Sequence, residues 1–252
     1  MKRIIALVLL CLFLTGCTAP EPQPDDPTPP EQGQTGNDPS QQEQPQHSPL
    51  YLPDFEVEEI ITYFSEVSLD AEITNSGNPN LLQKWATPIY YWIDGDYTDQ
   101  DITVLEGFAD WLNAVEGFPG MQQAESPLQA TMHIYFCLPD EMASTMGNWT
   151  YGLDGAVTFN YRDNRIYHAT ICYRSDIEQE IRNSVILEEI YNGLGPVQDS
   201  DLRSDSIIYS GYSIPQSLTA VDELLLRLLY HPQMICGMDA AQCAEVIRQL
   251  YY

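Results

Sequence analysis

Residues 18–49 cannot contribute to a hydrophobic core, and this confines any fold to the chain that follows them. The segment holds nine Pro, seven Gln and six acidic residues, with no Lys, no Arg and no aliphatic side chain beyond Ala19. Such a segment buries too little apolar surface to offset the entropy lost on ordering. We therefore expect a disordered linker over residues 18–50 and one folded domain over residues 51–252.

The first seventeen residues predict a signal peptide. Lys2 and Arg3 precede an apolar run, residues 4–14, that is too short to span a bilayer as a helix. The run leads into the sequence LTGC at residues 14–17, which resembles the lipobox of bacterial lipoproteins. The resemblance implies cleavage before Cys17 and acylation of its thiol. We expect an extracytoplasmic protein of the cell envelope that is lipid-anchored to a membrane.

The net charge of the chain argues against nucleic acid as a partner. The chain has 37 Asp and Glu against 10 Lys and Arg, a formal net charge of −27. Proteins that bind nucleic acid need clustered Lys and Arg to neutralise phosphates, and the sequence has no such cluster. The partners we expect are the lipid bilayer, through acylated Cys17, and an unidentified protein, peptide or glycan.

Apolar periodicity and turn residues predict an α+β domain. Runs rich in β-branched and aromatic residues predict strands at residues 88–93, 132–137, 155–160 and 166–173. Apolar residues at helical spacing predict helices at residues 98–115, 176–193, 218–230 and 240–250. Residues 56–69 are expected to form a helix followed by a strand. His133 and His168 lie in two of the predicted strands, where single histidines are usually surface or core groups rather than ligands.

Four cysteines follow the linker, and an even number in an exported domain indicates disulfides. Cys137 and Cys172 lie at strand ends and can join neighbouring strands, and Cys236 and Cys243 can pair locally. We expect the pairs Cys137–Cys172 and Cys236–Cys243, with the two other pairings open. A zinc site built from these cysteines is disfavoured, because their spacing contains no C-x-x-C motif.

The end of the helix over residues 176–193 carries the motif of greatest interest. It reads EEIYNGLGPVQD over residues 188–199, followed by SIIY at residues 206–209. This arrangement resembles the metzincin metallopeptidases, whose signature is H-E-x-x-H-x-x-G-x-x-H followed by a Met-containing turn, often S-I-M-Y. The resemblance implies a zincin-like fold, with a mixed sheet packed on a long active-site helix and a helical C-terminal part. The run is also similar to that of an uncharacterised domain family of bacterial lipoproteins.

The zinc ligands of the signature are replaced in this chain. The signature glutamate falls on Glu189 and the glycine on Gly195. The three ligand histidines and the Met-turn methionine fall on Glu188, Asn192, Gln198 and Ile208. One carboxylate and two amides make a poor zinc site, so we expect no zinc. Together with Asp199 they form an all-oxygen set that suits calcium or magnesium better, or a polar pocket without a metal.

The replaced ligands leave three possible functions open. The leading hypothesis is a pseudoprotease, a non-catalytic binding or interaction module, in which Glu189 is a buried acid that holds the loop after Gly195 by hydrogen bonds. The alternative is a metal-dependent peptidase with Glu189 as general base and non-standard ligands. A third possibility is a structural envelope component in which the cleft has no role.

Overall fold

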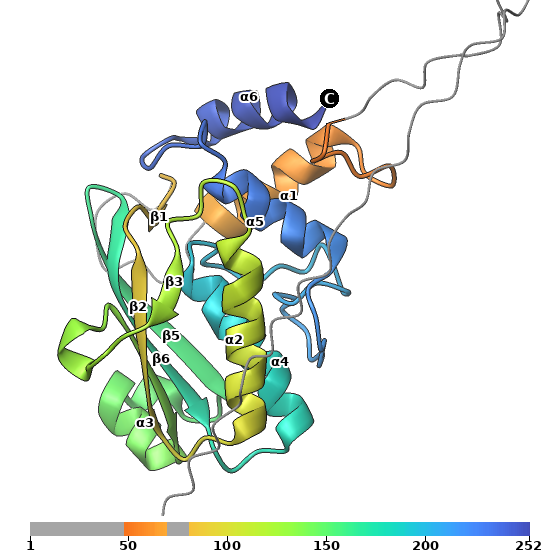
Figure 1. Ribbon diagram of the computed structural model, residues 1–252. Coiled ribbons are helices and arrows are strands. Elements are labelled where there is room, and N and C mark those ends of the chain that lie inside the picture. Colours follow the sequence, from red (N-terminus) through yellow and green to blue (C-terminus); the bar gives the residue numbers. More distant parts are fainter. Residues whose placement is uncertain (1–47, 70–80) are drawn as a thin grey trace, which may run out of the picture. The chain divides into compact units, whose positions relative to one another are not determined.

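Six strands form one mostly parallel sheet in the computed structural model, which describes residues 48–69 and 81–252 (Figure 1). The order is β1-β6-β4-β2-β3, and β5 pairs with β6 in the antiparallel direction. The strands are β1 (Lys84–Trp85), β2 (Ile89–Gly95), β3 (Met121–Gln123), β4 (Met132–Cys137), β5 (Gly155–Arg162) and β6 (Arg165–Arg174). The prediction of an α+β domain is confirmed, and the sheet is mixed only through β5.

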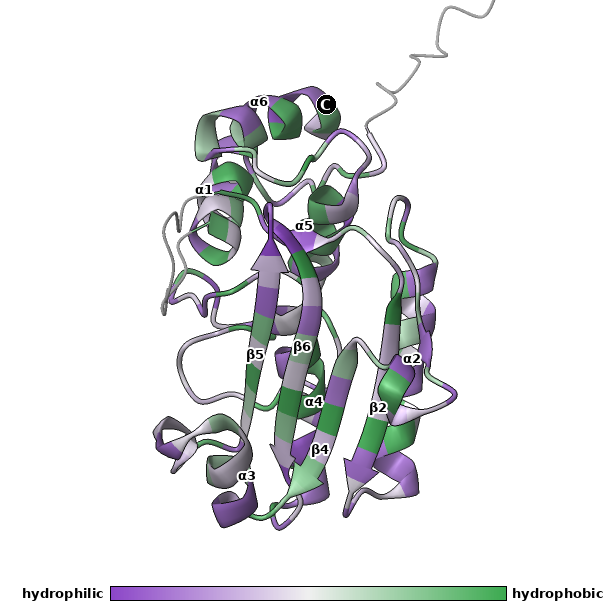
Figure 2. Cartoon of the chain, turned by 90° about the vertical axis from the view of Figure 1, so that its left-hand side faces the viewer, coloured by the Kyte–Doolittle hydropathy of each residue, from purple (hydrophilic) through white to green (hydrophobic). Residues whose placement is uncertain are grey.

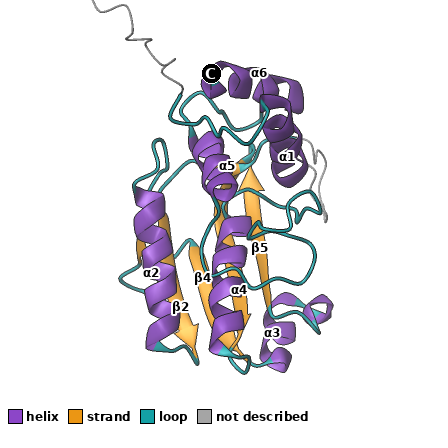
Figure 3. Ribbon diagram, turned by 90° about the vertical axis from the view of Figure 1, so that its right-hand side faces the viewer, coloured by secondary structure: helices purple, strands orange, loops and turns teal. Residues whose placement is uncertain are grey.

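Two of the helices cover one face of this sheet. The α-helices are α1 (Val57–Leu69), α2 (Asp99–Asn113), α3 (Pro139–Met146), α4 (Gln179–Gly193), α5 (Ala220–Tyr230) and α6 (Ala240–Tyr251). Figure 3 shows α2 and α4 lying across the sheet, and the main core fills the space between them and the strands. Figure 2 shows the opposite face, where α3 lies at one end of the strands and no helix crosses their middle.

Local signals in the sequence account for several element boundaries. The Thr98 hydroxyl accepts a hydrogen bond from Asp101 N, and the Asp101 carboxylate accepts one from Thr98 N, which closes a capping box at the start of α2. Asp163 and Asn164 connect β5 to β6 with φ angles of 52° and 59°. Positive φ at both central residues is what a tight hairpin requires, and Asp and Asn tolerate this conformation.

Two predictions need correction, and one helix was not predicted. Residues 56–69 form no strand, because Ile60, Phe64 and Val67 recur at helical spacing and are all buried on one side of α1. The helix expected from residue 176 begins at Gln179. The unpredicted helix is α3, which is short and buries only Met142 and Ala143.

A buried ion pair fixes α4 against α2. Arg182 Nε donates to Asp101 Oδ1 at 2.8 Å, and both side chains are almost fully buried. Burial raises the pKa of Asp101, but hydrogen bonds from Arg182, Thr98 and Gln179 outweigh burial and hold that pKa below its usual value. The pair sets how α4 lies on the sheet, and therefore where its last turn is presented.

Several sequence-based expectations fall outside the described residues. The predicted signal peptide, Cys17 and the linker up to residue 47 all lie there. In the part of the chain that the structure describes, no helix has both the length and the apolar character needed to cross a membrane.

Candidate functional site

Side chains from distant elements bind the C-terminal end of α4. The Trp85 indole nitrogen donates to Gly193 O at 2.9 Å, and the Tyr230 hydroxyl donates to Leu194 O at 2.7 Å. These bonds satisfy carbonyl groups that have no partner within the helix at its C-terminal end. Both donors are buried, so the final turn of α4 is held rigidly in the core.

Gly195 turns the chain back toward α1. Its φ is +135°, and a Cβ at this position would lie 2.5 Å from the carbonyl oxygen of Gln83. Only glycine fits both constraints. The following segment is then fixed by two backbone bonds to one acceptor, because Val197 N and Gln198 N both donate to Val67 O, at 2.7 and 3.3 Å.

The SIIY segment forms the packed turn that the sequence suggested. Ile208, at the position of the Met-turn methionine, is fully buried in the same core as α4. The Ser206 hydroxyl donates to Asp222 Oδ1 at 2.5 Å, and the Tyr63 hydroxyl donates to Ser206 Oγ at 2.8 Å. Asp222 also caps α5 together with Thr219, so this one carboxylate joins the turn to the helix that follows it.

Four acidic side chains gather near the last turn of α4. Burial, then the charges of Asp199 and Asp154, raises the pKa of Glu188 from 4.5 to about 8. Burial, then the charges of Glu188 and Asp199, raises the pKa of Glu189 well above its ordinary value. Glu188 is therefore largely protonated at neutral pH, and the same causes favour the protonated form of Glu189.

The backbone of β5 closes one side of this acidic group. Glu189 is 8% exposed, and a Cβ on Gly155 would lie 3.0 Å from its Oε1 atom and 2.3 Å from Val185 Cγ1. The glycine at the start of β5 thus allows the edge strand to approach α4 closely. Asp154, the residue before it, is paired with Arg174 at 3.2 Å.

No basic side chain pairs with Glu188 or Glu189 in the described residues. The Glu188 and Glu189 side chains form no hydrogen bond or ion pair there, and Asn192 Oδ1 is buried without a hydrogen-bond partner. Within residues 48–69 and 81–252, no hydrogen bond joins the Glu189 side chain to the loop after Gly195, so the holding role expected of Glu189 stays a prediction. In the described residues the backbone of α1 holds the start of that loop through Val67 O, while Trp85 and Tyr230 hold the helix end before Gly195.

The structure brings together most, but not all, of the residues singled out in the sequence. Glu188, Glu189 and Asp199 interact electrostatically, and Asn192 lies one turn beyond Glu188 on the same side of α4. Gln198 is positioned through its backbone, and no hydrogen bond joins its side chain to the others among the described residues. Asp154 and Gly155 were missed, because no local signal links the start of a strand to a distant helix end.

The donor set does not fit zinc. Zinc favours imidazole and thiolate ligands, whereas this group offers carboxyl and amide oxygens. No group of three or more His, Cys, Asp or Glu side chains within residues 48–69 and 81–252 is arranged to hold a metal ion. An oxygen-only set would suit calcium or magnesium, which stays a prediction.

The cysteines lie in two separate places. Cys137 and Cys172 are both buried in a small cluster beneath α3, and a hydrogen bond from the Cys172 thiol lowers the pKa of Cys137. Cys243 is buried, and the Cys236 thiol faces the carbonyl oxygen of Lys84 at 3.9 Å. All four are free thiols here, and the two predicted disulfides stay predictions.

Comparison with known proteins gives the family. A family model described as "Protein of unknown function (DUF2927)" matches residues 57–249, and the chain therefore belongs to that family. The match begins at the start of α1 and ends within α6, so it covers the sheet and all six described α-helices. No curated protein matches the chain.

Proposed function

We propose that this DUF2927 member is a lipid-anchored extracytoplasmic protein whose metzincin-like domain lacks a zinc centre and serves as a binding or interaction module. Its anchor would be acylated Cys17, and residues 18–50 would hold the domain away from the membrane. Its partner would be a protein, a peptide or a glycan.

The chemistry of the side chains at the end of α4 carries this proposal. The positions that correspond to zinc ligands are occupied by Glu188, Asn192 and Gln198, which offer carboxyl and amide oxygens and no imidazole nitrogen. The two on α4 have no hydrogen-bond partner for their side chains within the described residues. A buried, unpaired acid next to a second acid retains its proton, and a protonated carboxyl group binds metal ions poorly.

Three features support the zincin-like part of the proposal. A long helix ends beside the antiparallel edge strand β5, a glycine with positive φ reverses the chain after it, and a buried SIIY turn packs in the same core. The signature has the same order of helix, glycine and turn. The scaffold would thus be retained while the imidazole ligands are absent.

The competing hypothesis is a hydrolase with Glu189 as general base. A general base must be ionised at the working pH, and burial beside Glu188 and Asp199 keeps the pKa of Glu189 well above its ordinary value. No cationic side chain lies near enough in the described residues to reverse this effect. The site thus favours binding over proton abstraction.

Cleavage assays test the proposal. The full chain is incubated with a mixed peptide library, with and without added Zn²⁺, and products are followed by mass spectrometry. We expect no cleavage by the wild type or by Glu189→Gln. Cleavage by the wild type that Glu189→Gln abolishes would instead establish the hydrolase.

A further inference from the structure

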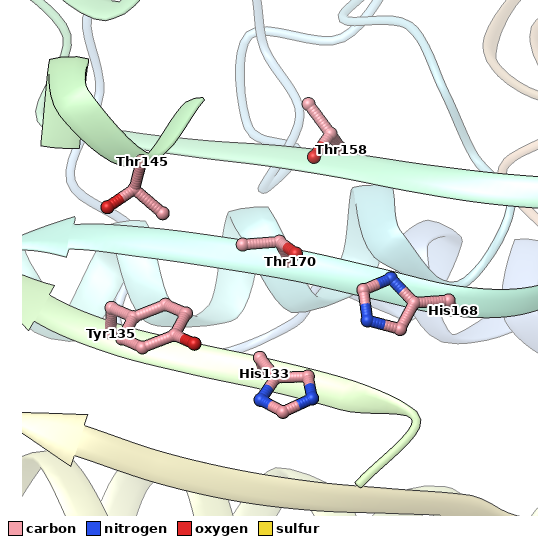
Figure 4. A pocket seen from close by; sticks show the side chains of 6 residues that line it. All are labelled: His133, Tyr135, Thr145, Thr158, His168 and Thr170. Carbon is pink, nitrogen blue, oxygen red and sulfur yellow. The ribbon is translucent and has the colours of Figure 1, made fainter. Parts of the chain in front are cut away.

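The face of the sheet opposite α2 and α4 carries a polar hollow. It has a volume of about 270 Å³ and is lined by His133, Tyr135, Thr145, Thr158, His168 and Thr170. Figure 4 shows these side chains rising from β4, β5 and β6, with Thr145 reaching in from α3. His133 and Tyr135 alternate along β4 with Met132 and Ile134, which face the main core, so the hollow lies on the other face of the sheet, separate from the site described above.

Strand pairing brings the two histidines together. His133 on β4 is in register with Thr170 on β6, and His168 lies two residues before Thr170 on the same face of the sheet. Their imidazole centroids are 5.5 Å apart with an interplanar angle of 38°. In Figure 4 the two rings lie side by side above the strands.

The imidazole nitrogens of His133 and His168 are not engaged in hydrogen bonds or ion pairs within the described part of the chain. The Tyr135 ring lies nearly parallel to the His133 ring, with a centroid distance of 6.3 Å and an interplanar angle of 11°. The hollow therefore presents two neighbouring imidazoles with available nitrogens, surrounded by hydroxyl groups and without a carboxylate among its lining residues.

We propose that His133 and His168 together bind a divalent d-block ion that favours imidazole, with Zn²⁺ as the best match. Water completes the coordination, and the hydroxyls of Tyr135, Thr158 and Thr170 are available to hydrogen-bond that water. Two protein ligands leave at least two positions open, so the site is exchangeable and accessible to a further donor.

The spacing of the rings fits a tetrahedral ion. With a Zn–N distance of about 2.1 Å to one nitrogen of each imidazole, tetrahedral geometry separates the ring centroids by about 5 Å. The observed 5.5 Å is close to this value and needs only a small rotation of the side chains. Imidazole pairs select zinc, copper and nickel over calcium and magnesium, whose preferred ligands are oxygens.

Calorimetric titration of the full chain with Zn²⁺ tests this site. We expect one saturable Zn²⁺ equivalent in the wild type, weakened about tenfold or more by His133→Ala and by His168→Ala, because each removes one of two protein ligands. His231→Ala is the matched control, because His231 lies after α5, away from the hollow, and should leave Zn²⁺ affinity unchanged. Far-ultraviolet circular dichroism of each variant checks that it is folded.

Electron paramagnetic resonance with Cu²⁺ gives a second reading that does not depend on affinity. The wild type should show coupling to two imidazole nitrogens, and each single variant should show coupling to one. Absence of saturable Zn²⁺ binding, or binding that survives both His133→Ala and His168→Ala, would overturn the proposal. Neither result bears on the cleavage assay above, because the two sites lie on opposite faces of the sheet.

Discussion

Gly155 lies directly against the buried carboxyl group of Glu189, so closely that a single added methyl group would contact it at 3.0 Å. This contact joins the edge strand β5 to the last turn of α4, two elements that no local sequence pattern connects. The contact explains why the Glu189 carboxyl group is shielded from water.

Gly155→Ala should destabilise the domain by about 1–3 kcal/mol, because the new methyl group overlaps Val185 Cγ1 and Glu189 and forces one of them to move. Urea unfolding measures the effect. Gly107→Ala is the matched control: it lies within α2, its Cβ would contact nothing within 4 Å, and alanine should stabilise that helix by about 0.5–1 kcal/mol. Equal effects of the two substitutions would show that β5 does not press on Glu189.

Glu188 should make stability depend on pH in the direction opposite to an ordinary surface acid. Its pKa rises from 4.5 to about 8 on folding, so its contribution to stability is full below pH 4.5 and is lost as the pH rises through about 8. Glu188→Gln should therefore be more stable than the wild type by about 1–3 kcal/mol at pH 8.5, and nearly equal to it at pH 4.5.

Urea unfolding across this pH range measures the difference. Glu180→Gln, at an exposed position on the same helix, should change stability by less than about 0.5 kcal/mol at every pH. If the difference in stability between Glu188→Gln and the wild type stays constant from pH 4.5 to 8.5, folding does not raise the pKa of Glu188.

The thiols of Cys137 and Cys172 are expected to form a disulfide when the chain is exported. The chain-entropy estimate for a loop of this length gives about 2–4 kcal/mol of stabilisation. Protein isolated from the envelope should lose 2 Da relative to its reduced form for each disulfide, and Cys137→Ser should lower its melting temperature. In reducing buffer Cys137→Ser and the wild type should differ far less. Alkylation of both thiols in freshly isolated protein would rule the disulfide out.

Cys17 is expected to anchor the chain. In cells, Cys17→Ser should shift the protein from the detergent phase to the aqueous phase of a Triton X-114 partition, because the acyl chains supply the membrane affinity. Metabolic labelling with a palmitate analogue should mark the wild type and not the variant. Cys11→Ser is the matched control, since Cys11 lies within the apolar run before the lipobox. Equal labelling of Cys17→Ser and wild type would contradict the lipoprotein assignment.

Much of the fold could be predicted from local sequence. Strand β4 occupies the predicted residues because its apolar and aromatic residues alternate, and α5 begins where Thr219 and Asp222 form a capping box. The sequence of α1 does not decide between helix and strand, because its apolar residues at positions 60, 61, 63 and 64 fit both patterns. Packing against α6 selects the helix. Propensity alone does not decide such cases.

The site could be predicted only along α4 itself. Helical spacing places Glu188 and Asn192 on one side, but Asp154 and Gly155 reach them through the antiparallel pairing of β5 with β6. In the same way, His133 and His168 meet only because β4 and β6 are paired in parallel. Long-range register of this kind is set by tertiary packing, which no pattern within a single strand records.

The central claim is that the end of α4 holds no zinc. The direct measurement is zinc content and peptide cleavage of the full chain carrying both His133→Ala and His168→Ala, purified without chelator, so that the hollow on the opposite face contributes nothing. The account predicts far less than one zinc per chain and no cleavage. One zinc per chain, together with cleavage that Glu189→Gln abolishes, would contradict it.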